Sequence, residues 1–325
     1  MATEFDLIKR FFSRPVSAGL LGGGDDCALF GVTPGLQVAT STDLLLEGRH
    51  FFSDVDPRSL GHKALAVNLS DLAAIGARPL GCLLGLGLPA IDEAWVKQFA
   101  DGFYALADQH GCALLGGDTT RSQQGITLSV TVFGEVEPSL ALRRNAAQVG
   151  DDIWVSGNLG AADIACRMLA GEIPLDTALL QATRRALEWP TPRIELSLQL
   201  RSLVHAAIDV SDGLLQDLGH ILAASGVGAE LQEPLLPLHH ALTGLSRHTL
   251  PPEVLRRAVL AGGDVYELCF TAAPSQRAAL EKIGQTLGVA LTCIGAIRKE
   301  PGLVVYDQTG TAIPELPSGF DHFRL

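Results

Sequence analysis

The sequence predicts a two-domain chain of mixed helices and strands. The chain has 325 residues, which is longer than one typical domain, and its 47% hydrophobic content is enough for two cores. Apolar residues recur at strand spacing in some stretches and at helical spacing in others. A less periodic segment separates the two halves. We therefore predict an N-terminal domain over residues 1–137, a linker over 138–150 and a C-terminal domain over 151–325.

The N-terminal half alternates between helical and strand patterns. Residues 3–12 predict a short amphipathic helix that lacks the apolar core of a signal peptide. A longer helix is expected to begin at Asp56-Pro57, because proline is favoured at the first helical position. Another helix over 94–110 ends at Gly111, a C-cap signal. Strands are predicted over 36–40, 80–88, 112–115 and 125–136, and a further strand is expected to begin after Asp26.

The C-terminal half begins with a predicted strand over 152–156, followed by a glycine turn and a helix from Ala161. Residues 184–203 read as helical around the proline-containing interruption at 189–192. Residues 206–213 lead into a helix over 214–224, which Ser211 or Asp212 is expected to cap. The N–H groups at the start of that helix are a natural anion site. Further strands are expected after the turn at 262–264 and around Ile294 and Val304.

Composition excludes several classes of function. The formal net charge is -12, and no basic patch is visible, so nucleic acid is not an expected partner. Polyphosphate binding would need divalent cations between the ligand and the carboxylates. The six cysteines are scattered without a Cys-x-x-Cys pair, which favours reduced thiols and a cytoplasmic location. The longest apolar run, residues 79–91, is too short to cross a bilayer, so we expect no membrane association.

Asp71 is the most informative single carboxylate. Counting back by helical steps gives Val67, Ala64 and Leu60, so Asp71 lies at the end of an apolar helix face. A carboxylate there must be paired, hydrogen-bonded or bound to a metal. The alternative interpretation is that Ser70-Asp71 caps a second short helix.

Five stretches share the same pattern, in which an apolar element and small residues lead to aspartate: Asp25-Asp26, Asp43, Asp71, Asp118 and Asp209 with Asp212. Histidine and cysteine spacings typical of zinc or iron are absent, and so is the aspartate loop of an EF-hand. Dispersed oxygen ligands favour Mg²⁺, which completes its coordination with water and substrate phosphates. No P-loop or protein-kinase signature is present.

Five motifs in order carry a resemblance to a known family: Gly-Gly-Asp-Asp-Cys-Ala (23–28), Ser-Thr-Asp (41–43), Val-Asn-Leu-Ser-Asp-Leu-Ala-Ala (67–74), Gly-Gly-Asp-Thr (116–119) and Ile-Asp-Val-Ser-Asp-Gly-Leu (208–214). Together they resemble the thiamine-monophosphate kinases, which belong to the superfamily of aminoimidazole ribonucleotide synthetase and selenophosphate synthetase. The resemblance implies an enzyme that phosphorylates thiamine monophosphate to thiamine diphosphate with ATP in the cytoplasm. It also implies an α/β plus α+β fold and a homodimer formed through the N-terminal sheet.

The resemblance also implies roles for individual residues. The implied Mg²⁺ ligands are Asp26, Ser41, Thr42, Asp43, Asp71, Asp118, Asp209 and Asp212. The implied ATP contacts are Gly117, Asp118, Arg144 and Ser211, where Arg143 stands next to Arg144. The implied contacts to thiamine monophosphate are His50, Asp264 and Phe320. A structural role is the alternative for the lone His50.

Chemistry and sequence departures refine this expectation. The attacking phosphate has a second pKa near 6, so it is anionic at neutral pH and needs no general base. Direct transfer of the γ-phosphoryl group, assisted by several Mg²⁺ ions, is therefore expected. At the substrate end, Asp264 and Val265 replace the family's Glu-Asp, and Phe320 replaces tyrosine or tryptophan.

Three other protein classes are alternatives to a thiamine-monophosphate kinase. A selenophosphate synthetase would need a reactive cysteine and a lysine ahead of the aspartate loop, and residues 13–24 contain neither. A hydrogenase-maturation relative would end in cysteine, whereas this chain ends in Leu325. A protein that binds nucleotide or metal without catalysis would take up Mg²⁺-ATP without turnover when thiamine monophosphate is added.

Overall fold

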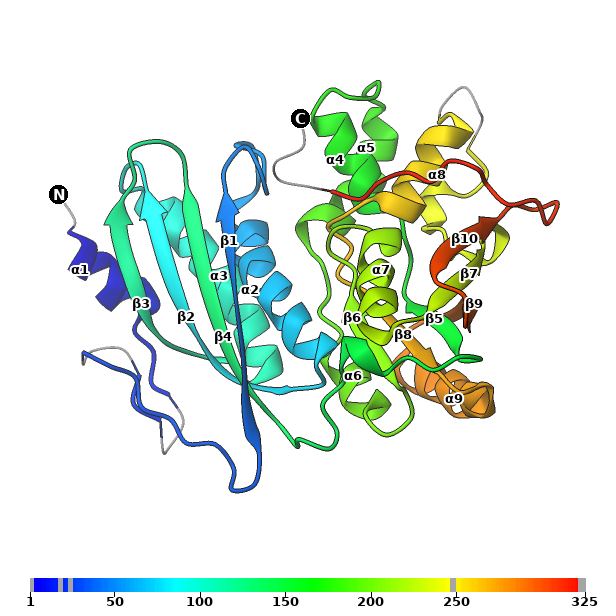
Figure 1. Ribbon diagram of the computed structural model, residues 1–325. Helices are drawn as coiled ribbons and strands as arrows, with labels where there is room; N and C mark the ends of the chain where they lie inside the picture. The colour runs from blue at the N-terminus through cyan, green and yellow to red at the C-terminus, as the bar shows by residue number, and fades with distance from the viewer. Residues whose placement is uncertain (1–2, 17–19, 23–25, 246–249, 321–325) are drawn as a thin grey trace. The chain divides into compact units, whose positions relative to one another are not determined.

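The computed structural model describes residues 3–16, 20–22, 26–245 and 250–320 (Figure 1). The chain divides into two compact units, one of residues 1–72 and 77–139 and the other of residues 73–76 and 140–325. Each unit is built around one sheet. Within the described residues no helix has both the length and the apolar composition that a membrane span requires.

The first unit contains a four-stranded sheet in the order β1-β4-β2-β3, in which only β2 and β3 run parallel. Its elements are α1 (Glu4–Leu7), η1 (Ile8–Phe12), β1 (Gln37–Leu46), α2 (Pro57–Ala74), β2 (Arg78–Leu88), α3 (Glu93–His110), β3 (Ala113–Arg121) and β4 (Thr127–Val136). The helices α2 and α3 pack on one face of this sheet (Figure 1). The predicted helix starts and the Gly111 cap are confirmed.

Two glycines let α2 and α3 approach closely. A Cβ added to Gly61 would lie 2.0 Å from the carbonyl oxygen of Phe99, and one added to Gly102 would lie 1.9 Å from that of Arg58. Because these contacts are reciprocal, the two helices cross backbone against backbone. Almost every residue of α2 from Ser59 onward is at least half-buried, so it carries no simple apolar stripe. The prediction that α2 has one apolar face was therefore incomplete, because the helix is buried on nearly all sides.

Two strand boundaries were predicted wrongly, and both affect site residues. Ser41, Thr42 and Asp43 lie inside β1, not after its end, because β4 continues to pair with this strand as far as Leu46. Likewise β3 runs through the Gly-Gly-Asp-Thr motif to Arg121, since β2 pairs with it there. The strand expected after Asp26 is reduced to a single bridge between Leu21 and Leu29.

The second unit contains a six-stranded sheet in the order β10-β7-β9-β5-β8-β6, in which only β10 and β7 run parallel. Its strands are β5 (Asp152–Ser156), β6 (Ala206–Asp209), β7 (Gly228–Gln232), β8 (Leu268–Ala272), β9 (Leu291–Arg298) and β10 (Gly302–Tyr306). Its helices are η2 (Arg144–Ala146), α4 (Ala161–Leu169), α5 (Thr177–Glu188), α6 (Ile194–Leu200), α7 (Leu214–Ser225), η3 (Glu233–Leu235), η4 (His240–Leu242), α8 (Pro252–Ala261), η5 (Pro274–Gln276) and α9 (Arg277–Leu287). A continuous apolar core joins the sheet to α7, through residues such as Ile208, Leu218 and Cys269.

Candidate functional site

In the first unit, α2 presents polar side chains to the edge strand β1. The Ser41 hydroxyl donates a hydrogen bond of 2.5 Å to the Asp71 carboxylate. One helical turn earlier, the buried Asn68 side chain accepts from the backbone N–H of Asp43 at 3.0 Å and donates to the Ala64 carbonyl. The structure therefore brings three of the predicted ligands, Ser41, Asp43 and Asp71, to one edge of the sheet.

Thr42 does not join this group through its side chain. Its hydroxyl donates to the Val130 carbonyl at 3.0 Å and accepts from the hydroxyl of Thr131 at 2.9 Å. Side chains alternate between the two faces of a strand, so Thr42 points to the sheet face opposite Ser41 and Asp43. That outward side of β1 is exposed.

Gly117 and Asp118 lie on β3, at the far edge of the same sheet. The register aligns Asp43 with Val130, Val130 with Leu84 and Leu84 with Gly117. Asp43 and Gly117 are therefore separated by three strand spacings, which together make roughly 14 Å. Asp118, the next residue, points to the opposite face. The carboxylates of Asp43 and Asp118 from one chain are therefore too far apart to bind the same Mg²⁺ ion.

The remaining predicted residues of the first unit lie in connecting segments. Asp26 is an exposed residue in a bend of the N-terminal segment, and Asp25 lies outside the described residues. His50 follows β1 in a turn, where its Nδ1 accepts from the backbone N–H of Leu46 at 3.0 Å. The carbonyl of His50 accepts from the ammonium of Lys63. These contacts support the alternative that His50 has a structural role, because its side chain accepts a hydrogen bond that stabilises the turn after β1.

The second unit collects its predicted residues around one segment, the aspartate loop, which we define as residues 209–213. Asp209 ends β6 and is only 4% exposed, opposite Leu268 of β8. Ser211 and Asp212 follow in the connection to α7. Gly213 has a φ of 117°, and a Cβ there would lie 2.6 Å from the Ala261 backbone, so only glycine fits this close packing.

The expected cap of α7 was wrong. Neither Ser211 nor Asp212 caps this helix, and the N-cap residue is Gly213. Instead Asp217, in the first turn of the helix, reaches back and accepts from the backbone N–H groups of Ser211, Asp212 and Gly213 at 3.0, 3.0 and 3.1 Å. Burial raises the pKa of the Asp217 carboxyl to about 7, although these backbone donors act in the opposite direction. Asp217 therefore bonds the N–H groups of the loop that precedes the helix, and the predicted anion site at the first turn of α7 stays a prediction.

The segment Gly262–Glu267 is hydrogen-bonded to the aspartate loop. The N–H of Asp264 donates to the Ser211 carbonyl, and that of Tyr266 to the Val210 carbonyl, both at 2.8 Å. Asp264 and Tyr266 have φ values of 59° and 55°, a left-handed conformation that non-glycine residues seldom adopt. The Tyr266 hydroxyl donates to the Asp264 carboxylate at 3.1 Å. Tertiary bonds therefore hold Asp264 in a strained backbone conformation.

Phe320 joins the same group from the end of the described chain. Its N–H donates to the Asp212 carbonyl at 3.0 Å, and its carbonyl accepts from the Gln216 side-chain amide at 2.9 Å. The residue is 39% exposed. Ser211, Asp212, Asp264 and Phe320, from three separate stretches of sequence, thus form one hydrogen-bonded assembly.

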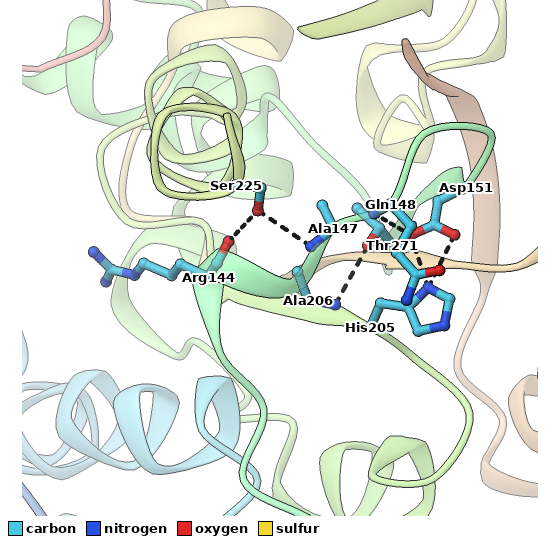
Figure 2. Close-up of polar contacts among 8 residues, drawn as sticks. All are labelled: Arg144, Ala147, Gln148, Asp151, His205, Ala206, Ser225 and Thr271. Carbon is cyan, nitrogen blue, oxygen red and sulfur yellow. Dashed lines mark hydrogen bonds and ion pairs between the residues drawn. The ribbon is translucent and has the colours of Figure 1, made fainter. Parts of the chain in front are cut away.

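Arg144 is fixed by its backbone at the other end of α7. The Ser225 hydroxyl donates to the Arg144 carbonyl at 2.9 Å and accepts from the N–H of Ala147 at 3.1 Å. Figure 2 shows the exposed Arg144 side chain extending away from this contact. Arg143 instead bridges to Ala206 of β6. The two arginines therefore differ in their surroundings.

Sequence reasoning missed two residues next to this assembly, Asp217 and Glu267. Arg193 forms a bidentate ion pair with Glu267, which also accepts from the Ser156 hydroxyl at 2.5 Å. An acidic residue in the first turn of a helix is a known signal for reaching back to the cap, and Asp217 carries it. No local signal pairs Arg193 with Glu267, since 74 residues separate them.

The donor set of the first unit fits Mg²⁺ in part. Among the described residues, no group of three histidine, cysteine, aspartate or glutamate side chains is close enough to hold a metal alone. Mg²⁺ is commonly held by one or two carboxylates together with substrate phosphates. Asp71 with Ser41 and the neighbouring Asp43 provides oxygen ligands of that kind.

Comparison with known proteins matches both halves of the chain. The domain described as AIR synthase related protein, N-terminal domain, matches residues 24–136, and the corresponding C-terminal domain matches residues 148–308. The chain is 43% identical to the thiamine-monophosphate kinase of Escherichia coli K12 over 98% of each chain. It is 40% identical to that of Haemophilus influenzae, over 99% of this chain and 98% of the relative.

The chain is also similar to solved structures of thiamine-monophosphate kinases. A thiamine-monophosphate kinase from Stenotrophomonas maltophilia K279a has a TM-score of 0.83 and 46% identity, covering 94% of this chain and 95% of its own. A structure of AaThiL complexed with AMPPCP and TMP has a TM-score of 0.77 and 28% identity, covering 90% and 89%. The hydrogenase maturation protein HypE of Escherichia coli, at 22% identity and a TM-score of 0.77, shares the fold.

Proposed function

Because the chain belongs to the thiamine-monophosphate kinase family, we propose that it phosphorylates thiamine monophosphate with ATP to give thiamine diphosphate and ADP. The observation that carries the proposal is the assembly in the second unit. There the proposed ATP contact Ser211 and the proposed Mg²⁺ ligand Asp212 are hydrogen-bonded to the proposed substrate contacts Asp264 and Phe320. We also propose that the protein is cytoplasmic, as the sequence predicts.

The proposed reaction is a direct transfer. A phosphate oxygen of thiamine monophosphate forms the new bond to the γ-phosphorus of ATP, and the bond from that phosphorus to the bridging oxygen of ADP breaks. The attacking phosphate is already anionic at neutral pH, so no side chain need remove a proton. The main barrier is repulsion between two polyanions, which positioning and charge neutralisation reduce.

Bound Mg²⁺ would neutralise phosphate charge and hold the reacting oxygens in line. We propose that several Mg²⁺ ions bind and that their ligands are drawn from Asp26, Ser41, Asp43, Asp71, Asp209 and Asp212, together with Thr42 and Asp118. The outward orientation of the Thr42 side chain leaves its backbone as the group that would contribute. Gly117, Asp118, Arg144 and Ser211 are proposed for ATP, and His50, Asp264 and Phe320 for thiamine monophosphate.

A homodimer is part of the proposal. The outward face of β1 exposes Val38, Leu44 and Leu46 at 50%, 60% and 41%. A sheet face with exposed large apolar side chains favours association with a second copy. Asp118 lies on this same face, so a dimer formed there would bring it near the partner's sheet. Sedimentation velocity measures the mass, and a monomer at micromolar concentration would contradict this part.

Asp264→Glu tests the substrate end of the site. Aspartate tolerates the left-handed conformation at φ 59° better than glutamate does, but its side chain is one methylene shorter. We expect Asp264→Glu to change the KM for thiamine monophosphate while the KM for ATP stays the same. Steady-state kinetics with each substrate varied in turn measures both constants. An unchanged KM for thiamine monophosphate would remove Asp264 from the proposed substrate contacts.

The competing function is binding of nucleotide without catalysis. Isothermal titration calorimetry with Mg²⁺-ATP, followed by addition of thiamine monophosphate, separates the two. A kinase gives sustained heat of turnover and accumulates ADP after the second addition. A binding protein gives one saturable binding signal and no ADP.

A further inference from the structure

Asp217 has no role in the function proposed above, yet it makes the most concentrated set of backbone contacts near the site. One oxygen of its carboxylate accepts from three consecutive N–H groups, those of Ser211, Asp212 and Gly213, at 3.0 to 3.1 Å. The Asp217 side chain is buried, with the residue 3% exposed. Three bonds to one buried oxygen fix the orientation of three successive peptide groups.

The backbone around these residues leaves them little room to move. A Cβ on Gly213 would lie 2.6 Å from Ala261, one on Gly263 2.6 Å from the Ser211 carbonyl oxygen, and one on Gly319 2.7 Å from that of Asp212. Two segments distant in sequence, one around residues 261–263 and the other at Gly319, thus pack directly against the aspartate loop. Such close packing transmits small displacements to neighbouring groups.

The same loop determines where the substrate-side residues lie. The carbonyl of Ser211 accepts from the N–H of Asp264, and that of Asp212 accepts from the N–H of Phe320. Gln216, which precedes Asp217 on α7, donates to the Phe320 carbonyl. A peptide group has its N–H and C=O on one rigid plane, so a rotation at 211–213 moves the partners of these carbonyls as well.

We propose that Asp217 is a positioning residue of the kinase reaction. By holding the N–H groups of the aspartate loop, it places Ser211 and Asp212 for ATP and, through their carbonyls, Asp264 and Phe320 for thiamine monophosphate. The inference rests on the proposed function. It also implies that the loop contacts ATP through side chains, because its three N–H groups at 211–213 are already bonded.

The test compares Asp217→Ala with Asp217→Asn. Alanine removes the acceptor, and we expect the KM values for both ATP and thiamine monophosphate to rise by roughly tenfold to a hundredfold. Asparagine keeps an oxygen in the same place, so it should restore most of the wild-type constants. Asp152→Ala is the matched control, since Asp152 is a buried carboxylate of the same unit that pairs with Arg277. It should lower the unfolding temperature without changing either KM.

Amide hydrogen exchange gives a readout that does not depend on activity. In Asp217→Ala, exchange should accelerate at residues 211–213, 264 and 320, and Asp217→Asn should keep most of the protection. Faster exchange with unchanged KM values in an active enzyme would overturn the inference and leave the proposed function intact. Equal losses in the Asn and Ala variants would also overturn it, because the charge would then matter instead of the hydrogen bonds. A wild-type protein without turnover would refute the proposed function itself.

Discussion

Asp71→Asn is expected to lower kcat by about a hundredfold or more, because it removes one negative charge from the proposed Mg²⁺ site. Asparagine has nearly the same shape and still offers an oxygen to the Ser41 hydroxyl, which now bonds to the Asp71 carboxylate at 2.5 Å. The neighbouring bond between Asn68 and the Asp43 backbone is untouched. The fold should therefore persist, and a higher Mg²⁺ concentration should be needed for half-maximal rate.

Kinetics over a range of Mg²⁺ concentrations, together with thermal unfolding in the presence and absence of Mg²⁺, measures this effect. Asp101→Asn is a matched control in the same unit, because Asp101 is an exposed residue on α3 that pairs only with the nearby Lys97 among the contacts described for it. It should leave the rate and the Mg²⁺ requirement unchanged. If Asp71→Asn keeps even a tenth of the wild-type rate, Asp71 is part of the scaffold and not a ligand.

The largest effect on stability is expected from Glu267→Ala. The carboxylate of Glu267 forms a bidentate ion pair with Arg193 and accepts from the Ser156 hydroxyl, which in turn accepts from the Leu268 N–H at 2.9 Å. The Arg193 and Glu267 side chains are 19% and 10% exposed. Removing one partner leaves a buried charge unpaired, which costs about 3–5 kcal/mol of unfolding free energy.

Guanidinium unfolding monitored by tryptophan fluorescence checks this prediction, since Trp154 lies on β5, which pairs with β8. Arg256→Ala is the control, because Arg256 forms a more exposed pair with Glu233, for which a loss of at most about 1 kcal/mol is expected. The segment Gly262–Glu267 should also lose protection from hydrogen exchange in Glu267→Ala. Equal destabilisation by the two variants would contradict the prediction, because the buried pair would then contribute no more to the free energy of unfolding than the exposed pair.

Local signals predicted those elements whose ends are encoded nearby in the sequence. Asp56-Pro57 marks the start of α2, and Gly111 marks the end of α3. The strand predicted over 152–156 coincides with β5. The strands β1 and β3 run through polar motifs that resemble loops, because β4 and β2 supply hydrogen bonds from distant sequence. Pairing with a neighbouring strand is not readable from the motif itself.

The candidate site, like the fold, could be predicted from the sequence only in part. Its aspartates were recognisable because each follows apolar and small residues. The sequence did not indicate that Thr42 and Asp118 point away from Asp43, since that depends on strand register. Nor could it predict the positive φ of Asp264 and Tyr266, because bonds to the Ser211 and Val210 carbonyls determine that conformation. Tertiary hydrogen bonds, and not local propensity, complete the site.

The most direct test of the proposed function follows the γ-phosphoryl group itself. The purified protein is incubated with γ-labelled ATP, Mg²⁺ and thiamine monophosphate, and the products and the protein are separated by chromatography. Direct transfer predicts label in thiamine diphosphate, equimolar ADP and no label on the protein at the earliest times. Label attached to the protein after brief exposure to ATP would contradict direct transfer, and an absence of labelled thiamine diphosphate would contradict the kinase assignment.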